Sequence, residues 1–356
     1  MVPRCPKIFL AAIALACALG AAAPAAGAAI RIGVVANAQD WGQEQGVAKQ
    51  TGAGWLREQF LWEVIEPRDD QWNWDRYDRL LTQSSRRGLR VLPLLMDVPG
   101  WAGGGWNFIP RRRGEYAEYV AKVVGRYGPG GHFWRTHPEL RPLAPRWFEI
   151  WNEPYYPYYA GNGVNAARYA RLVRASVRKG RRANPKARFL MAADTGYSDP
   201  RDRYRDWVDE MYKAVPGLTR WYDGVAVHPY SDGLAPQVYT PNDNTRGQVG
   251  RLAEVFRNIR SHGARRQKLW ITEIGWSTCR SGKLCVTEKQ QASYIRKTYE
   301  LARTRWRGMV AALFIYHLRD HGQADGSNPE SWFGTIRHDG SRKPSWRVLR
   351  AIARSG

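Results

Sequence analysis

Two glutamates in this sequence follow apolar, aromatic runs that end abruptly. The run at 147–150 leads through Trp-Asn into Glu153 and a proline, and the run at 268–272 leads into Glu273, an isoleucine, a glycine and a tryptophan. Such runs are typical of buried strands, and proline stops a strand where no further backbone donor is needed. Two carboxyls at neighbouring strand ends can cleave a glycosidic bond: one protonates the departing oxygen, and the other attacks or stabilises the sugar carbon.

Each glutamate taken alone has a simpler explanation. The helix dipole favours a carboxylate near a helix N-terminus, so either Glu153 or Glu273 could be an ordinary first-turn acid. The repeated pattern of a strand followed by a glutamate favours the paired interpretation. That interpretation requires both strands to deliver their carboxyl ends to one face, as the strands of a parallel barrel do.

Strand-like and helix-like segments alternate along the chain from residue 30. Strands are predicted at 30–35, 54–60, 89–96, 147–152, 187–193, 224–228, 269–272 and 309–316. Helices are predicted at 43–50, 74–87, 114–127, 165–183, 203–215, 245–262, 287–305 and 344–353. Near-continuous apolar strands indicate a parallel sheet covered by helices. Eight units favour a single-domain (β/α)8 TIM barrel over 30–356, with an open doubly wound sheet as the alternative.

The motifs around the two glutamates resemble those of the clan A glycoside hydrolases, in particular families 39 and 5. Arg57 is similar to the arginine beneath the nucleophile of these enzymes, and His228-Pro-Tyr230 resembles their His-x-Tyr motif on strand 6. The resemblance implies a retaining O-glycosyl hydrolase that acts on a polysaccharide or oligosaccharide by double displacement, without a metal or other cofactor. Glu153 would be the acid/base and Glu273 the nucleophile.

Further positions take roles from the same resemblance, which covers about 30–353. Asn152 would donate its amide to the sugar 2-hydroxyl. Many members carry a tryptophan at the end of strand 8 that forms the floor of the sugar subsite, whereas this sequence has Tyr316 there. The families act on several sugars, and these motifs do not choose among them.

Physical chemistry agrees with the roles that the resemblance implies. Arg57 and the Tyr230 hydroxyl would keep Glu273 ionised. Apolar surroundings and the charge of Glu273 would raise the pKa of Glu153, so that it holds a proton. His228 lies on the same side of a strand as Tyr230. It is equally consistent with a ligand-facing side chain and with a satisfied histidine inside the barrel.

Aromatic residues make up 12% of the chain, with 17 Trp and 18 Tyr, which is more than a core alone would absorb. Aromatic side chains offer flat apolar faces on which sugar rings can stack. Candidate walls of a substrate groove lie in loops on the carboxyl side of the strands: Trp101, Trp106, Tyr155, Tyr156, Trp276 and Trp332. For any one of these residues, ordinary loop packing is the alternative.

The first 29 residues have the three parts of a secretory signal peptide. A short positive start precedes an apolar stretch at 8–19 and small residues at 21–29. We expect cleavage near 27–29 and a secreted, extracellular protein. An uncleaved anchor is the alternative, although the apolar stretch is too short to span a bilayer. The sequence has no other long apolar run, so no membrane span is expected.

Cys279 and Cys285 are the two cysteines that lie beyond the expected signal peptide. A close, isolated pair in a secreted chain predicts a disulfide. No further cysteine or suitably spaced histidine supports a zinc site. The bond would pin the loop that follows Glu273.

The chain is strongly basic, with 55 Lys and Arg against 32 acidic residues and a net charge of +23. The arginines are spread over the predicted helices, as an arginine-biased composition would place them. The charge also suits an acidic cell-wall polymer as a partner. No nucleic-acid-binding motif accompanies it, so nucleic acid is not expected. A non-catalytic barrel that binds polyanions is the alternative function, but it would not need two neighbouring carboxyls.

Overall fold

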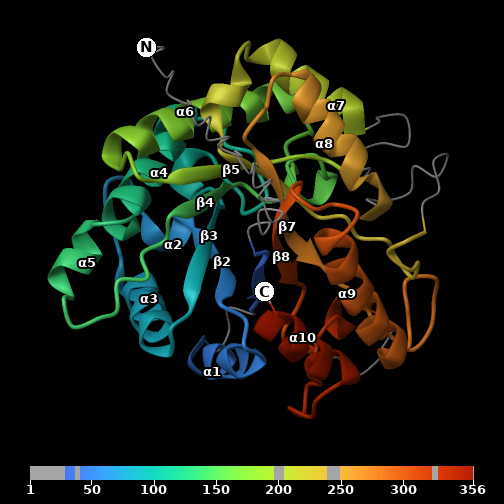
Figure 1. Ribbon diagram of the computed structural model, residues 1–356. Coiled ribbons are helices and arrows are strands. Elements are labelled where there is room, and N and C mark those ends of the chain that lie inside the picture. The colour runs from blue at the N-terminus through green and yellow to red at the C-terminus, as the bar shows by residue number, and fades with distance from the viewer. Residues whose placement is uncertain (1–28, 37–40, 196–203, 239–248, 323–327, 356) are drawn as a thin grey trace, which may run out of the picture.

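The computed structural model describes residues 29–36, 41–195, 204–238, 249–322 and 328–355. Within this part of the chain, eight parallel strands close into a barrel in sequence order, with β1 paired to β8. Helices surround the barrel on its outer side (Figure 1). The single-domain (β/α)8 TIM barrel predicted from the sequence is confirmed.

The strands alternate with helices as the sequence predicts. The strands are β1 Arg31–Val35, β2 Trp55–Leu61, β3 Arg90–Met96, β4 Trp147–Ile150, β5 Arg188–Ala192, β6 Gly224–Val227, β7 Lys268–Ile274 and β8 Val310–Ile315. The helices are α1 Trp41–Thr51, α2 Trp62–Ile65, α3 Asp75–Arg87, α4 Arg113–Tyr127, α5 His132–Thr136, α6 Ala166–Ala183, α7 Tyr204–Ala214, α8 Leu252–Ser261, α9 Glu288–Arg303 and α10 Pro344–Ser355.

Two strand ends near the predicted site differ from the sequence-based boundaries. β4 stops at Ile150 because Trp151 has a φ of 65°, in the left-handed region that interrupts an extended ladder. β7 continues to Ile274, which still pairs with Ile315 of β8 after an irregularity in register. Glu273 is therefore the second-last residue of β7 and belongs to the sheet, not to the loop that follows it.

Other differences lie away from the site. The short helices α2 and α5 are not predicted, because four or five residues carry too little periodicity to detect. Of the helix predicted at 245–262, residues 245–248 lie outside the described part of the chain. The expected signal peptide lies outside it too, apart from Ala29. Among the described helices, none has the length and apolar composition that crossing a membrane requires.

The barrel interior is filled by side chains and is not a pore. An apolar cluster separate from the strand–helix core consists of Leu92, Leu190, Ala226, Trp270, Ala312 and Phe314. Gly33 leaves room for it, since a Cβ there would lie 2.4 Å from the Phe314 ring. Polar side chains of the strands continue the filling toward the carboxyl ends, where the site lies.

The loop after β7 is closed by a disulfide between Cys279 and Cys285, as predicted from the sequence. The loop also carries Trp276, whose indole N–H donates to the Leu234 carbonyl at 2.9 Å. The Gln291 side chain of α9 donates in turn to the Trp276 carbonyl at 2.9 Å. The loop beside Glu273 is therefore held covalently and by hydrogen bonds to two neighbouring segments.

Replacing both cysteines by serine should lower the free energy of unfolding by about 2 kcal/mol, the chain-entropy value for so short a loop. Denaturant unfolding of the Cys279→Ser/Cys285→Ser variant and the wild type would measure the difference. An equal midpoint, or two free thiols detected by mass spectrometry in the wild type, would contradict this prediction.

Candidate active site

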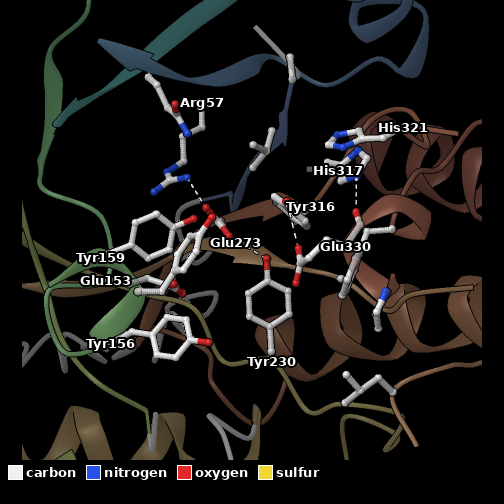
Figure 2. A pocket seen from close by; sticks show the side chains of 18 of the residues that line it. Arg57, Glu153, Tyr156, Tyr159, Tyr230, Glu273, Tyr316, His317, His321 and Glu330 are labelled. Carbon is white, nitrogen blue, oxygen red and sulfur yellow. Dashed lines mark hydrogen bonds and ion pairs between the residues drawn. The ribbon is translucent and has the colours of Figure 1, made fainter. Parts of the chain in front are cut away.

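A cavity of about 590 Å³ opens at the carboxyl ends of the strands. Charged side chains of its wall come from β2, from β7 and from the connections after β4, β6 and β8. Tyrosines come from the same three connections (Figure 2). Both predicted catalytic residues, Glu153 and Glu273, line it. A (β/α)8 barrel binds its ligands at this face.

Glu273 is held by two donors, one on β2 and one in the connection after β6. Arg57 of β2 donates from Nη1 to its Oε1 at 2.5 Å, and the Tyr230 hydroxyl donates to its Oε2 at 2.7 Å. Burial alone would raise the pKa of Glu273, but His228, Arg57 and the Tyr230 hydroxyl together lower it below its usual value. The two contacts expected from the sequence are therefore present, and they keep this carboxylate ionised.

Arg57 is itself fixed by acceptors below the cavity. Its Nε and Nη2 donate to the two oxygens of Glu149 at 2.7 and 3.1 Å, and Nη2 also donates to Asn152 Oδ1 at 2.8 Å. Burial opposes the charge, but Glu149 and Glu273 outweigh it and raise the pKa of Arg57. Bidentate pairing fixes the plane of the guanidinium, and this places Nη1 against Glu273.

Glu149 is a part of the site that the sequence-based prediction missed. Its signal is nevertheless in the sequence, because a glutamate inside an apolar strand must find a partner when it is buried. Asn152, predicted to face the cleft, is 2% exposed and gives its side-chain oxygen to Arg57. The Asn152 side chain therefore contacts the buried ion pairs of Arg57 with Glu149 and Glu273.

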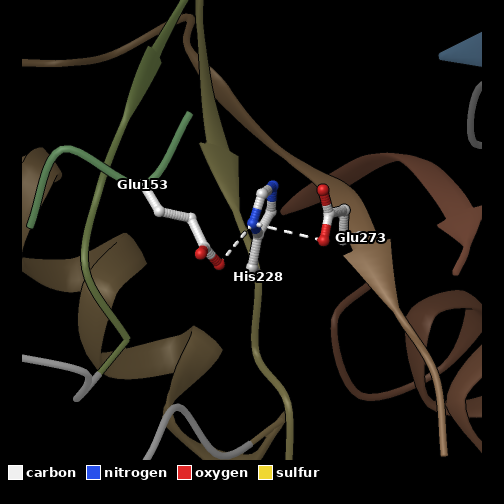
Figure 3. A group of neighbouring side chains, drawn as sticks. All are labelled: Glu153, His228 and Glu273. Carbon is white, nitrogen blue, oxygen red and sulfur yellow. Dashed lines mark hydrogen bonds and ion pairs between the residues drawn. The ribbon is translucent and has the colours of Figure 1, made fainter. Parts of the chain in front are cut away.

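His228 lies between the two glutamates (Figure 3). Its Nδ1 is 2.7 Å from Glu153 Oε1 and 3.7 Å from Glu273 Oε2, and its Nε2 is 3.0 Å from Thr272 Oγ1. Burial would lower the pKa of His228, but Glu273 and Glu153 raise it above its usual value. The sequence left open whether this histidine faces a ligand or the interior, and the structure places it inside, in contact with both carboxyls.

Glu153 is buried and set on an unusual backbone. Burial raises its pKa above the usual value; the nearby Glu273 charge adds to this and His228 opposes it. Its φ is 39°, two residues after Trp151 at 65°. Left-handed conformations of non-glycine residues cost about 1–3 kcal/mol each and gather at functional sites. Here they turn the chain so that the Glu153 carboxyl reaches His228.

The two carboxyls are close together. Glu153, His228 and Glu273 each offer one ligand atom, and these atoms all lie within 4.8 Å of one another. The closest oxygens of the two glutamates are therefore separated by no more than this distance, on one face of the barrel.

Known structures with this fold were found by structural comparison. A family 39 glycoside hydrolase from Bacteroides cellulosilyticus matches with a TM-score of 0.69 and 21% identity over 91% of this chain and 63% of its own. A family 39 β-xylosidase from Caulobacter crescentus matches with 0.63 and 19% over 92% and 72%. A family 5 enzyme from Bifidobacterium longum matches with 0.61 and 13% over 92% and 78%.

This chain shares its fold with glycoside hydrolases of families 39 and 5. The resemblance to families 39 and 5 that the sequence motifs indicate is confirmed at this level. The chain spans less than two thirds of the length of the first structure that it matches. No protein-family model matches the sequence, and no curated protein is significantly similar to it.

The aromatic wall of the cavity matches the sequence-based suggestion only in part. Of the six predicted wall residues, only Tyr156 is in the described lining, together with Tyr316 from the expected floor position. The remaining aromatic lining consists of Tyr158, Tyr159, Tyr230 and Phe333. Tyr316 occupies the position at the end of β8 where a floor residue is expected, and its ring meets Tyr230 edge-on with centroids 6.0 Å apart.

The described lining of this cavity contains no tryptophan, so the four tryptophans among the six predicted wall residues are not part of it. Trp276 is fully buried because its indole N–H turns toward Leu234. Trp101 donates to the Glu66 carbonyl at 2.9 Å and packs edge-on against Trp62. The other aromatic residues proposed for the wall but placed outside it are Trp106, Tyr155 and Trp332.

One side of the cavity comes from the long connection after β8, where Tyr316 and Trp332 were the predicted site residues. His317, His321 and Glu330 line it there, and the Tyr316 hydroxyl donates to Glu330 Oε2 at 3.4 Å. Burial lowers the pKa of His317 to about 3, so its imidazole is neutral. Isolated polar residues in a long loop carry no spacing signal, so the sequence alone could not select them.

The cluster of Glu153, His228 and Glu273 has a spacing that a metal ion could use. Arg57 and Tyr230 already donate to both oxygens of Glu273, and a metal would lie close to the Arg57 charge. This arrangement suits a proton-transferring pair of carboxyls better than a metal centre.

Removing the Tyr230 hydroxyl tests how Glu273 is kept ionised. In Tyr230→Phe the pKa of Glu273 should rise, because a hydrogen bond that favours the charged form is lost. For a reaction that requires the carboxylate, the acid limb of the profile of kcat/KM against pH should shift to higher pH. The maximum of kcat/KM should fall about tenfold or more. The pH dependence of kcat/KM would measure both effects.

Tyr316→Phe is the matched control for this measurement, because its hydroxyl contacts Glu330. The acid limb should stay in place in this variant. An acid limb that moves equally in both variants, or in neither, would contradict the role given to Tyr230.

Proposed function

We propose that this protein is a retaining glycoside hydrolase that cleaves O-glycosidic bonds of a polysaccharide or oligosaccharide by double displacement. The observation that carries the proposal is the pair of carboxyls within 4.8 Å, one with a raised and the other with a lowered pKa. Retaining enzymes hold their carboxyls about 5–5.5 Å apart, whereas inverting enzymes need about 6.5–9.5 Å to fit a water between carboxyl and sugar.

In the first step Glu273 attacks the anomeric carbon while Glu153 donates its proton to the departing oxygen. The bond to the leaving group breaks as the bond to Glu273 Oε forms, and the sugar becomes covalently attached. Asn152 gives its oxygen to Arg57, which leaves its Nδ2 as a donor for the sugar 2-hydroxyl.

In the second step Glu153 acts as the base. Once Glu273 is esterified its negative charge is gone, so the pKa of Glu153 falls and the carboxylate can take a proton from water. The water attacks the anomeric carbon and releases Glu273. His228 contacts Glu153 in the resting state and orients its carboxyl for both transfers.

The substrate class follows from the fold and from the cavity. Similar structures include a β-xylosidase and a family 5 enzyme in complex with Manβ1-4GlcNAc. The tyrosine rings of the cavity wall provide flat apolar surfaces, and Glu330, His317 and His321 provide polar groups for hydroxyls. These features support a carbohydrate ligand and do not select a particular sugar.

A hydrolysis screen over aryl glycosides and plant and microbial polysaccharides tests the proposal. The anomeric configuration of the first-formed product, followed by NMR, distinguishes retention from inversion. We expect at least one substrate to be cleaved with retention, and cleavage to be lost in Glu273→Gln. An inverted product, or turnover that survives in Glu273→Gln, would overturn the assignment. Polyanion binding without any turnover would favour the non-catalytic alternative.

We also propose that the protein is secreted, on the basis of the three-part N-terminal segment. Secreted material should begin near residues 28–30. N-terminal sequencing would measure this, and a secreted chain that starts at Met1 would contradict it.

A further inference from the structure

A second hollow on the molecule is lined by arginine. It has a volume of about 290 Å³ and lies between the start of α4 and the outer face of α6. We call it the arginine groove, defined by Arg111, Arg113, Arg171, Arg174 and Arg178. Gly114 and Ala175 complete the described lining, which therefore contains no acidic side chain.

The spacing in α6 puts three of these arginines on one face. Arg171, Arg174 and Arg178 are three and four residues apart, so their side chains follow one another along the helix. α4 packs beside α6 (Figure 1), and Arg113 is its first residue. The helix dipole disfavours a cation at that end, so helix stability does not explain an arginine there.

Among the described residues, the arginine groove has no acidic side chain in direct contact with its guanidinium groups. In the described part of the chain, none of its five guanidinium groups forms an ion pair. Some other arginines do have acidic partners, as in the pairs Arg126–Asp78, Arg181–Asp223, Arg319–Glu44 and Arg337–Glu288. Like charges held at helical spacing repel one another, so an anion bound in the groove would relieve this repulsion.

Hydrogen bonds connect the segment that leads into the arginine groove to a segment that forms part of the cavity wall. Asn107 donates to the Tyr158 carbonyl at 2.8 Å and accepts from the Gly161 N–H at 3.1 Å, and Asn162 donates to the Ile109 carbonyl at 2.9 Å. These bonds join the connection after β3 to the connection after β4. The first connection continues into Arg111 and Arg113, and the second carries Tyr158 and Tyr159 of the cavity wall.

We propose that the arginine groove binds an anionic polysaccharide, one with carboxylate, sulfate or phosphate groups along its chain, and anchors it next to the catalytic cavity. The groove supplies charge on both sides of a hollow, as a charged polymer requires. The choice of a polysaccharide rests on the proposed function. A nucleic acid is disfavoured because the described lining has no aromatic ring on which a base could stack.

The test compares two triple variants of the full chain that lose the same charge. The groove variant removes the positive charge from the α6 side of the arginine groove by Arg171→Gln, Arg174→Gln and Arg178→Gln. Arg296→Gln, Arg347→Gln and Arg354→Gln are the control, since these arginines are exposed on α9 and α10, far from the groove in Figure 1. Thermal unfolding checks that both variants are folded.

Binding is measured without turnover, so the result does not depend on whether the enzyme assignment holds. The probes are polygalacturonate for carboxylate groups, dextran sulfate for sulfate groups, neutral dextran, and single-stranded DNA. Affinities are determined by calorimetry over a range of salt concentrations, because counterion release makes the affinity for a polyanion fall with salt.

The wild type should bind polygalacturonate or dextran sulfate and not neutral dextran. The groove variant should lose about 100-fold in affinity at low salt, and its plot of log affinity against log salt should be shallower by about three. The affinity of the control variant should fall by less than about threefold, because these arginines contribute only to the net charge of the protein.

Three results would overturn the proposal. Equal losses in the two triple variants would show that the charge acts diffusely. If neither polygalacturonate nor dextran sulfate binds, anionic polysaccharides are excluded as ligands of the arginine groove. A groove-dependent affinity for DNA that exceeds the affinity for both polysaccharides would assign the groove to nucleic acid.

Discussion

Glu273→Gln should reduce kcat/KM by about 10⁴-fold or more, the loss expected when a covalent nucleophile is removed. The amide keeps the shape of the side chain but cannot attack the anomeric carbon. Arg57 would also face a neutral group in place of the carboxylate that lies 2.5 Å from its Nη1. The measurement is steady-state hydrolysis of the best substrate from the screen, together with thermal unfolding.

Glu300→Gln serves as the control because Glu300 is exposed on α9, remote from the cavity. It should retain wild-type activity. A folded Glu273→Gln enzyme with more than a few per cent of wild-type activity would rule out Glu273 as the nucleophile.

Glu153→Ala should show an effect that depends on the leaving group. Substrates with poor leaving groups need the proton from Glu153, so their kcat/KM should fall by about 10²–10⁴-fold. Activated aryl glycosides need no protonation to depart, so they should still form the covalent intermediate. Hydrolysis of that intermediate is then slow, because no base activates the water.

Azide should rescue Glu153→Ala with activated substrates, since it attacks without a base. The glycosyl azide should have the same anomeric configuration as the substrate, because two inversions occur at Glu273. With Glu273→Ala, azide should instead give the opposite configuration by one direct displacement. Glu330→Ala, which also removes a carboxylate from the cavity wall, should give no azide product. Exchanged product configurations would reverse the roles of the two glutamates.

The barrel and the two central glutamates were predictable because each leaves a local signal. Apolar runs alternating with amphipathic segments set the number and order of strands, and a glutamate at the end of such a run marks the open face. Arg57 and Tyr230 could be placed only through the resemblance to known families. Their distances to Glu273 depend on how the strands close, which no local pattern contains.

The aromatic wall was not predictable in the same way. Trp276 and Trp101 lie in loops after strands, where a wall is expected, but hydrogen bonds to Leu234 and Glu66 turn their indoles inward. Tyr158 and Tyr159 lie in a similar loop and face the cavity. Contacts between segments decide which aromatic side chains of a loop face the cavity, and residue type alone does not determine this.

The buried ion network has a consequence for how the chain folds. Arg57 is 92 residues from Glu149 and 216 residues from Glu273 in sequence. Contacts between such distant segments form late, since long loops must close first. An intermediate containing β1 to β4 can already pair Arg57 with Glu149, but it lacks the second carboxylate until β7 docks. The two carboxyls of the proposed reaction therefore meet only after β7 has docked, so the site is incomplete in any intermediate that lacks this strand.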